Sequence, residues 1–262
     1  MRRWSINLFK VFGIQLELHA SFALLVAYVA YNGWHPGRGP GMLWDLFVLV
    51  LFFVCVVLHE LGHSLTARRY GVQVPRILLL PIGGMAQLDR MPREPKKELI
   101  ITVAGPAVNF GFVAIFLPTT LWAFFGSKEV APYSVVSLVT QLFFANLVMG
   151  TFNLLPVFPM DGGRIFRAML ATQTSYLEAT RWAARTGKVL AVGLAIVMAF
   201  CWHSYFGCAL FIFIYWAADM EYRFVAWEEK ENSRQLTKLS SVPRSPEAGE
   251  SPLPPLLAQD QP

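Results

Sequence analysis

Three long stretches of this 262-residue chain contain no Asp, Glu, Lys or Arg: residues 99–127, 130–160 and 189–218. Each is longer than the roughly 20 apolar residues that cross the hydrocarbon core of a bilayer as a helix. Charged residues make up 15% of the chain, against about 25% in soluble domains. These features exclude a soluble enzyme of ordinary composition and predict a membrane protein that crosses the bilayer several times.

The number and length of the apolar segments predict about six transmembrane helices, so the expected fold is an all-α polytopic membrane protein. The predicted spans cover residues 18–34, 42–67, 99–125, 133–155, 189–202 and 205–218. The last two are short, and a single kinked helix is the alternative to a tight hairpin at residues 203–205. We favour the hairpin, because a single helix would export a basic tail.

The positions of the basic residues predict how the chain is oriented. Of its 22 Lys and Arg residues, only Arg38 and Lys128 lie in loops on the far side from the termini. Because cytoplasmic loops are rich in Lys and Arg, both termini are expected in the cytoplasm of a multi-pass protein of the plasma (cell) membrane. The net charge of +5 therefore points to the lipid bilayer as partner and not to nucleic acid.

The chain divides by composition into two parts. Residues 1–220 form the expected integral membrane domain, and residues 221–262 form a polar, Pro-rich cytoplasmic tail that is expected to be disordered. The three cysteines, Cys55, Cys201 and Cys208, all lie in apolar segments, where they pack as small apolar side chains. No disulfide framework is predicted.

The second predicted span ends in a sequence typical of a metal site, His59-Glu60-Leu61-Gly62-His63. Four residues of helix bring the two imidazoles to one face, about 6 Å apart along the axis, where they can bind one metal ion. Glu60 can then reach a water on that ion as a general base without being a ligand. The alternative is a helix end whose polar side chains reach interfacial water. Polar residues inside a membrane segment favour the functional interpretation.

A catalytic zinc site needs a third protein ligand. Asp161 is one candidate, since it follows two prolines and precedes two glycines where the fourth span returns to the cytoplasm. A helix-capping role is its alternative. His19, His35 and His203 are the other candidates, and the last two are expected on the opposite side of the membrane.

Together these motifs resemble the site-2 proteases, intramembrane zinc metalloproteases that cut transmembrane segments. The resemblance rests on the histidine motif, on residues 104–109 (Ala-Gly-Pro-Ala-Val-Asn) and on residues 153–163, in this order and in separate spans. It extends to residues 18–22 and 81–84, and so covers roughly residues 10 to 220. Many members also carry PDZ or CBS modules, of which this sequence shows neither.

The resemblance implies a function for each motif residue. It makes His59, His63 and Asp161 the ligands of one Zn²⁺ per chain and Glu60 the catalytic base, within a membrane metalloprotease domain. Asn109 and Asn153 match active-site positions of the family, where an amide can donate to a developing oxyanion. A hydrogen bond between helices is an equally good interpretation of either asparagine.

Residues 72–88 contain β-branched residues, two prolines and the Gly83-Gly84 pair, which predict short strands and a turn after the second span. A strand edge beside the metal would hold a substrate segment by β-augmentation. An amphipathic connector on the membrane surface is the alternative.

The sequence therefore predicts an intramembrane zinc endopeptidase that cleaves the single span of another membrane protein. A catalytically silent membrane scaffold and an ion-pathway protein are the alternatives that use the same polar residues. Transporters are usually built from internal repeats, and none is visible here. A protease restricted to soluble peptides is a third alternative.

Overall fold

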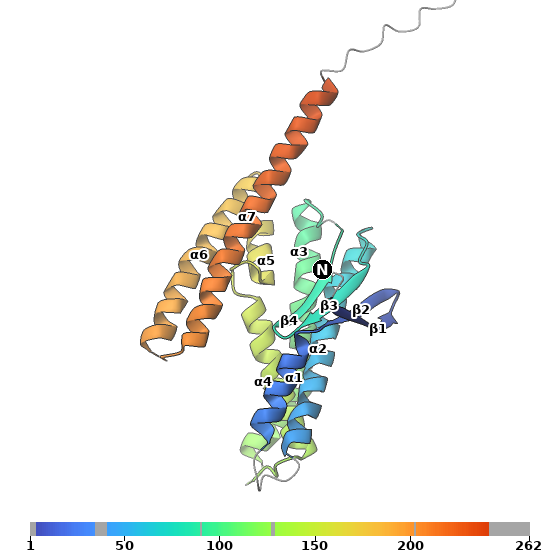
Figure 1. Cartoon of the computed structure of the whole chain (residues 1–262), viewed down its shortest axis with the longest axis vertical. Helices are drawn as coiled ribbons and strands as arrows, with labels where there is room; N and C mark the ends of the chain where they lie inside the picture. The colour runs from blue at the N-terminus through green and yellow to red at the C-terminus, as the bar shows by residue number, and fades with distance from the viewer. Residues whose placement is uncertain (1–3, 35–40, 90, 127–128, 202, 241–262) are drawn as a thin grey trace, which may run out of the picture.

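The structure is a computed structural model of the chain and describes all residues except 1–3, 35–40, 90, 127–128, 202 and 241–262 (Figure 1). Four described helices are long and apolar enough to cross a membrane: α2 (Gly41–Arg69), α3 (Pro95–Phe125), α4 (Val135–Asn153) and α6 (Tyr176–Phe200). A mostly helical, polytopic membrane protein is thereby confirmed. His35, Arg38, Lys128 and the tail from residue 241 lie outside the described residues.

The helices α2, α3 and α4 form the centre of the fold and coincide with the predicted spans 42–67, 99–125 and 133–155. Gly62 allows α2 to approach α3 closely, because a Cβ atom at this position would lie 2.7 Å from the backbone oxygen of Ala104. Small residues commonly permit such close backbone contact between helices in membranes.

We expect Gly62→Ala to weaken this contact. A methyl group cannot enter without separating the two backbones, and overpacking of this kind costs about 1–3 kcal/mol of the free energy of unfolding. Thermal unfolding of the purified protein in detergent should show a lower Tm. The control is Gly193→Ala on α6, where an added Cβ meets nothing within 4 Å. An equal Tm change in both variants would contradict the close packing of α2 on α3.

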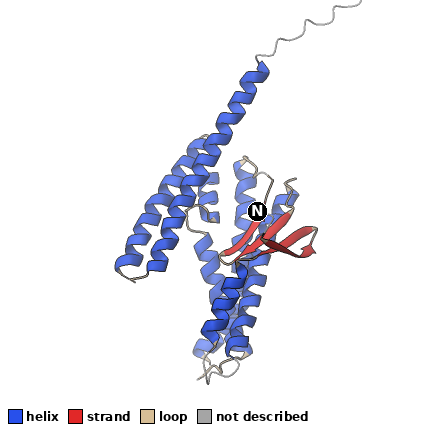
Figure 2. Cartoon of the chain, in the orientation of Figure 1, coloured by secondary structure: helices blue, strands red, loops and turns tan. Residues whose placement is uncertain are grey.

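A four-stranded sheet packs against the helices on the side opposite α6 (Figure 2). Its strands are β1 (Ser5–Val11), β2 (Ile14–His19), β3 (Arg76–Leu80) and β4 (Gly83–Gln87), in the order β1-β2-β3-β4. β2 and β3 are parallel, and the other two pairs are antiparallel. The strands predicted within residues 72–88 are confirmed as β3 and β4.

The start of the first predicted span differs from the structure. The span was expected from residue 18, but residues 5–19 form β1 and β2, and the helix α1 begins only at Phe22 and ends at Gly33. Phe12 and Gly13 both have positive φ, 51° and 80°, which suits a tight hairpin between antiparallel strands. The fold is therefore not all-α, because a hairpin precedes the first helix.

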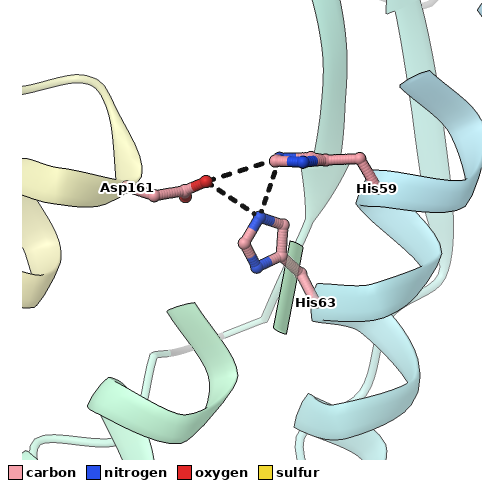
Figure 3. Close-up of side chains that lie close together, drawn as sticks. All are labelled: His59, His63 and Asp161. Carbon is pink, nitrogen blue, oxygen red and sulfur yellow. Dashed lines mark hydrogen bonds and ion pairs between the residues drawn. The ribbon is translucent and has the colours of Figure 1, made fainter. Parts of the chain in front are cut away.

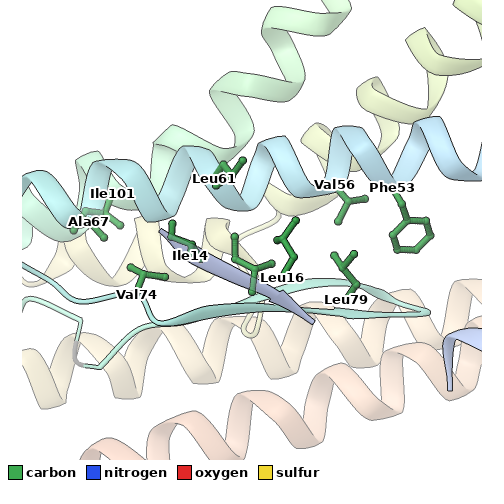
Figure 4. Close-up of a cluster of buried hydrophobic side chains, with 10 residues drawn as sticks. Ile14, Leu16, Phe53, Val56, Leu61, Ala67, Val74, Leu79 and Ile101 are labelled. Atoms are coloured by element: carbon green, nitrogen blue, oxygen red, sulfur yellow. The ribbon is translucent and has the colours of Figure 1, made fainter. Parts of the chain in front are cut away.

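One face of the sheet is apolar and covers α2 (Figure 4). Strands place alternate side chains on opposite faces, so Ile14 and Leu16 of β2 point to the helix together with Ile77 and Leu79 of β3. They are buried against residues of α2 that include Phe53, Val56 and Leu61. This packing holds the sheet beside the His59–His63 segment.

The last three helices are α5 (Asp161–Leu170), α6 and α7 (Tyr205–Ser240). α6 and α7 lie side by side and are joined by a short connection (Figure 1), so the chain forms a hairpin and not one kinked helix. The helix α6 begins earlier than the predicted span of residues 189–202. α7 extends through residues 221–240, which the sequence assigned to the disordered tail.

Ion pairs explain why α7 continues beyond its apolar part. Arg93 contacts Glu228 at 3.0 Å and Glu229 at 2.6 Å, and so connects α7 to the segment before α3. Arg167 of α5 is buried, contacts Glu98 of α3 and lies 2.9 Å from Glu221 of α7. These contacts hold polar turns of α7 against the rest of the protein.

Candidate metal centre

The histidines of the sequence motif lie on α2 and point toward Asp161 (Figure 3). The Nε2 atoms of His59 and His63 are 3.1 Å apart. Asp161 Oδ2 lies 3.3 Å from the first and 3.2 Å from the second. Among the described residues, these three form the one group of His, Cys, Asp and Glu side chains able to hold a metal ion.

Asp161 reaches the histidines because the chain between α4 and α5 is irregular and tightly packed. Gly162 allows α5 to begin against this segment, since a Cβ there would lie 2.2 Å from the Leu155 carbonyl oxygen. Met160, and not Asp161, is the N-cap of α5. Asp161 therefore lies in the first turn of α5, and its carboxylate contacts the imidazoles of His59 and His63. This position disfavours the helix-capping interpretation.

Hydrogen bonds on the far side of each imidazole fix its orientation. His63 Nδ1 lies 2.9 Å from the Ile101 carbonyl oxygen, and His59 Nδ1 lies 2.5 Å from Asn109 Oδ1. Both partners are acceptors, so each Nδ1 carries the proton and each Nε2 keeps its lone pair. Two lone pairs and a carboxylate oxygen then converge on one point, an arrangement that a cation stabilises.

The spacing of these atoms fits zinc. Three ligand atoms about 2.0–2.1 Å from a tetrahedral zinc ion lie about 3.3–3.4 Å from one another. The observed separations of 3.1, 3.2 and 3.3 Å are close to this value. Two imidazoles and one carboxylate also form the donor set of known catalytic zinc sites, which leave a position open for water.

Glu60 lies beside the ligand group but is not part of it. Its Oε2 accepts a hydrogen bond of 3.0 Å from the backbone N–H of Ala86 in β4. Gly84 of the same strand makes room for the side chain, since a Cβ there would lie 2.5 Å from Glu60 Cγ. The sheet therefore positions the carboxylate that the sequence predicts to be the base.

The two asparagines of the sequence analysis occupy different surroundings. Asn109 is buried, supports His59 through its oxygen and donates through Nδ2 to Asn146 of α4 at 2.9 Å. Asn153 makes no side-chain hydrogen bond to any residue within the described part of the chain. Asn146 was missed, although an asparagine inside an apolar helix is itself a signal of contact between helices.

Of the other histidines, the two that the structure describes do not join the group. His19 Nδ1 contacts the Ser21 hydroxyl at 2.7 Å, and His203 lies in the connection between α6 and α7.

We expect Asn109→Ala to weaken metal binding. Without the Asn109 oxygen that accepts the hydrogen bond of His59 Nδ1, the imidazole ring is free to rotate. Removal of a residue that orients a metal ligand in this way typically lowers metal affinity about 10–100-fold. Zinc competition against a chromophoric chelator measures this change. Asn153→Ala is the control and should keep the affinity of the unmodified protein. Equal affinities in all three proteins would contradict the supporting role of Asn109.

Comparison with known proteins agrees with this centre. Residues 47–127 and 118–197 match the model of peptidase family M50. A zinc metalloprotease of Methanocaldococcus jannaschii is 39% identical over 226 residues, which cover 86% of this chain and 62% of that relative. The stage IV sporulation protein FB of Bacillus subtilis is 28% identical over 184 residues, which cover 67% of this chain and 58% of that protein.

A solved structure is also similar. The site-2 protease from Methanocaldococcus jannaschii has 39% sequence identity to this chain and a TM-score of 0.60, and the match covers 84% of this chain and 95% of that one. The chain thus spans less than two thirds of the two relatives compared by sequence, but nearly all of the solved structure. The fold, the zinc-type donor group and these similarities together place the chain in peptidase family M50, the site-2 proteases.

Proposed function

We propose that the chain is an intramembrane zinc endopeptidase that cleaves a membrane-spanning segment of another membrane protein. The observation that carries this proposal is the convergence of Asp161 on His59 and His63, which lie on a helix long and apolar enough to cross a membrane. At about 1.5 Å per residue, His63 lies on the order of 8 Å along α2 from Arg68 and Arg69 at the end of the helix, and His59 lies one turn further from that end.

The residues around the centre suit peptide hydrolysis. His59, His63 and Asp161 would hold the zinc ion, which would supply Lewis-acid chemistry: a nucleophilic water at neutral pH and a polarised carbonyl group. Glu60 accepts the proton of the attacking water and passes it to the leaving amine. The hydrogen bond from Ala86 holds the carboxylate in place for both transfers. We assign the oxyanion role to Asn153, because Nδ2 of Asn109 is already bonded to Asn146.

The free edge of β4 is suited to hold the substrate. Ala86 turns its N–H toward Glu60 and hence away from β3. In an antiparallel pair the backbone groups alternate between the partner strand and the open edge, so Gly84 presents its N–H and C=O on the same edge. An extended substrate segment that pairs with Gly84 by β-augmentation would lie beside Glu60, which keeps the N–H of Ala86.

The remaining spans and the orientation belong to the same proposal. α1 and the apolar half of α7 would complete six crossings with both termini in the cytoplasm of the cell. α1 is only about 18 Å long, shorter than the roughly 30 Å core, so its crossing would require local thinning of the bilayer.

Cleavage of a tethered and a soluble substrate tests the proposal. The full chain is reconstituted in lipid vesicles with a single-span test protein, and in parallel with a soluble peptide of the same sequence. We expect cleavage of the tethered span that a zinc chelator stops. Cleavage of the soluble peptide alone would favour a peptidase of released peptides. No cleavage in the presence of bound zinc would favour a scaffold or an ion pathway.

A further inference from the structure

A cleft of about 980 Å³ separates the polar face of the sheet from α5 and α7. Because side chains alternate along a strand, Arg76 and Leu78 of β3 face this cleft while Ile77 and Leu79 face α2. The volume is at the upper end of the range of about 300–1,000 Å³ that is typical of ligand pockets.

One end of the cleft lies next to the metal centre. Its lining includes Ala86, whose N–H binds Glu60, and Arg164 of α5. Arg164 follows Asp161 by three residues, so it stands about 4.5 Å further along the same helix. A chain that leaves the centre along the open edge of β4 would therefore enter the cleft and pass Arg164.

Most charged side chains of the cleft already have partners. Three of its arginines are paired with carboxylates: Arg76 with Glu17, Arg93 with Glu228 and Glu229, and Arg167 with Glu98 and Glu221. Arg164 differs from them. It is half-buried, and its guanidinium makes neither an ion pair nor a hydrogen bond with the part of the chain that the structure describes, although its charge is attracted at longer range by Glu98, which is already bonded to Arg167.

An unpaired, half-buried guanidinium is a good ligand for an anion. Burial of a charge is costly unless a partner of opposite charge is present. The planar fork of five N–H donors matches a carboxylate in two-point contact. Within a peptidase, a carboxylate is available on the substrate as an acidic side chain and on the product as the new chain end.

We infer, on the basis of the proposed function, that this cleft holds an extended segment of the substrate polypeptide and that Arg164 binds a carboxylate on it. The strand edge recognises the backbone of any sequence, so Arg164 adds the sequence or product preference that the edge alone cannot provide. The segment is the part of the substrate that lies on the cytoplasmic side of the metal centre.

Matched single-span substrates test whether the carboxylate that Arg164 binds is an acidic side chain of the substrate. Glu, Gln or Lys is placed in turn at each of the first few positions on the cytoplasmic side of the cut, and cleavage by the full chain in vesicles is measured. The unmodified protein should prefer Glu over Lys at one position by about tenfold or more, and R164E should reverse this order. R164K should keep the preference, and R181Q, which removes an exposed arginine of α6, should leave it unchanged.

A second arm tests the product chain end. A peptide that ends at the cut is added as the free acid or as the amide. If the new carboxylate is the ligand, the acid should inhibit the unmodified protein at least tenfold more strongly than the amide, and R164Q should remove the difference. Zinc content, measured in each variant, reports whether the fold is retained.

Two results would overturn the inference in distinguishable ways. If the Gln substrate is cleaved but R164E and R164Q change neither the preference nor the inhibition, Arg164 has no role in binding and the proposed function stands. If the unmodified protein cleaves none of the substrates, the proposed function fails and the inference fails with it.

Discussion

Glu60→Gln should slow cleavage severely and leave zinc bound. Gln has nearly the same shape as Glu and can still accept the hydrogen bond of Ala86, but it cannot take a proton from water. General acid and base catalysis contributes about 10²–10⁴-fold to a rate, so we expect a loss of on the order of 10³-fold. The three ligands are untouched, and zinc content should remain that of the unmodified protein.

The measurement is cleavage of a single-span substrate together with zinc analysis of the same sample. Glu178→Gln is the matched control, because Glu178 is an exposed residue in the first turn of α6. It should cut at the normal rate. A Glu60→Gln protein that cuts within tenfold of the normal rate would show that another group is the base.

Gly105→Ala should prevent metal binding although none of the three ligand residues is replaced. A Cβ at residue 105 would lie 2.1 Å from His63 Nε2 and 2.4 Å from its Cε1. The imidazole cannot move away without breaking its bond to Ile101 and leaving the triangle with His59 and Asp161. We therefore expect loss of both zinc and cleavage in a protein whose helices remain intact.

Gly111→Ala provides the control for this prediction. Gly111 lies on the same helix, α3, and an added Cβ there meets nothing within 4 Å. Zinc analysis and circular dichroism of both variants separate loss of the metal from loss of the fold. Normal zinc content in Gly105→Ala would mean that His63 is not held as described.

The sequence predicted the parts of the centre that depend on local spacing. His59 and His63 are four residues apart on one apolar helix, so their common face follows from helix geometry. Asp161 could be proposed because two prolines and two glycines surround it. The role of Asn109 could not be chosen from the sequence, since a contact to His59 and a contact to Asn146 both depend on how α2, α3 and α4 pack.

Several features that could not be predicted from the sequence depend on contacts between distant segments. β2 pairs with β3, and Gln15 and Arg76 are partners across a gap that contains two helices. The buried pair of Arg167 and Glu98 joins α5 to α3 and likewise has no local signal.

The β1–β2 hairpin, in contrast, is local, and residues 14–19 alternate apolar and polar side chains, a strand signal that the apolar-length criterion for spans overrode. In β1 the alternation shifts by one residue at Leu8 and Phe9, where its pairing with β2 is irregular.

The most direct test of the account is to locate the cut and count the metal in one preparation. The purified full chain is analysed for zinc, reconstituted with a single-span substrate in vesicles, and the products are identified by mass spectrometry. The proposed function predicts about one zinc ion per chain and a cut within the spanning segment. A cut only in the soluble part of the substrate, or cutting by a protein that holds no metal, would contradict it.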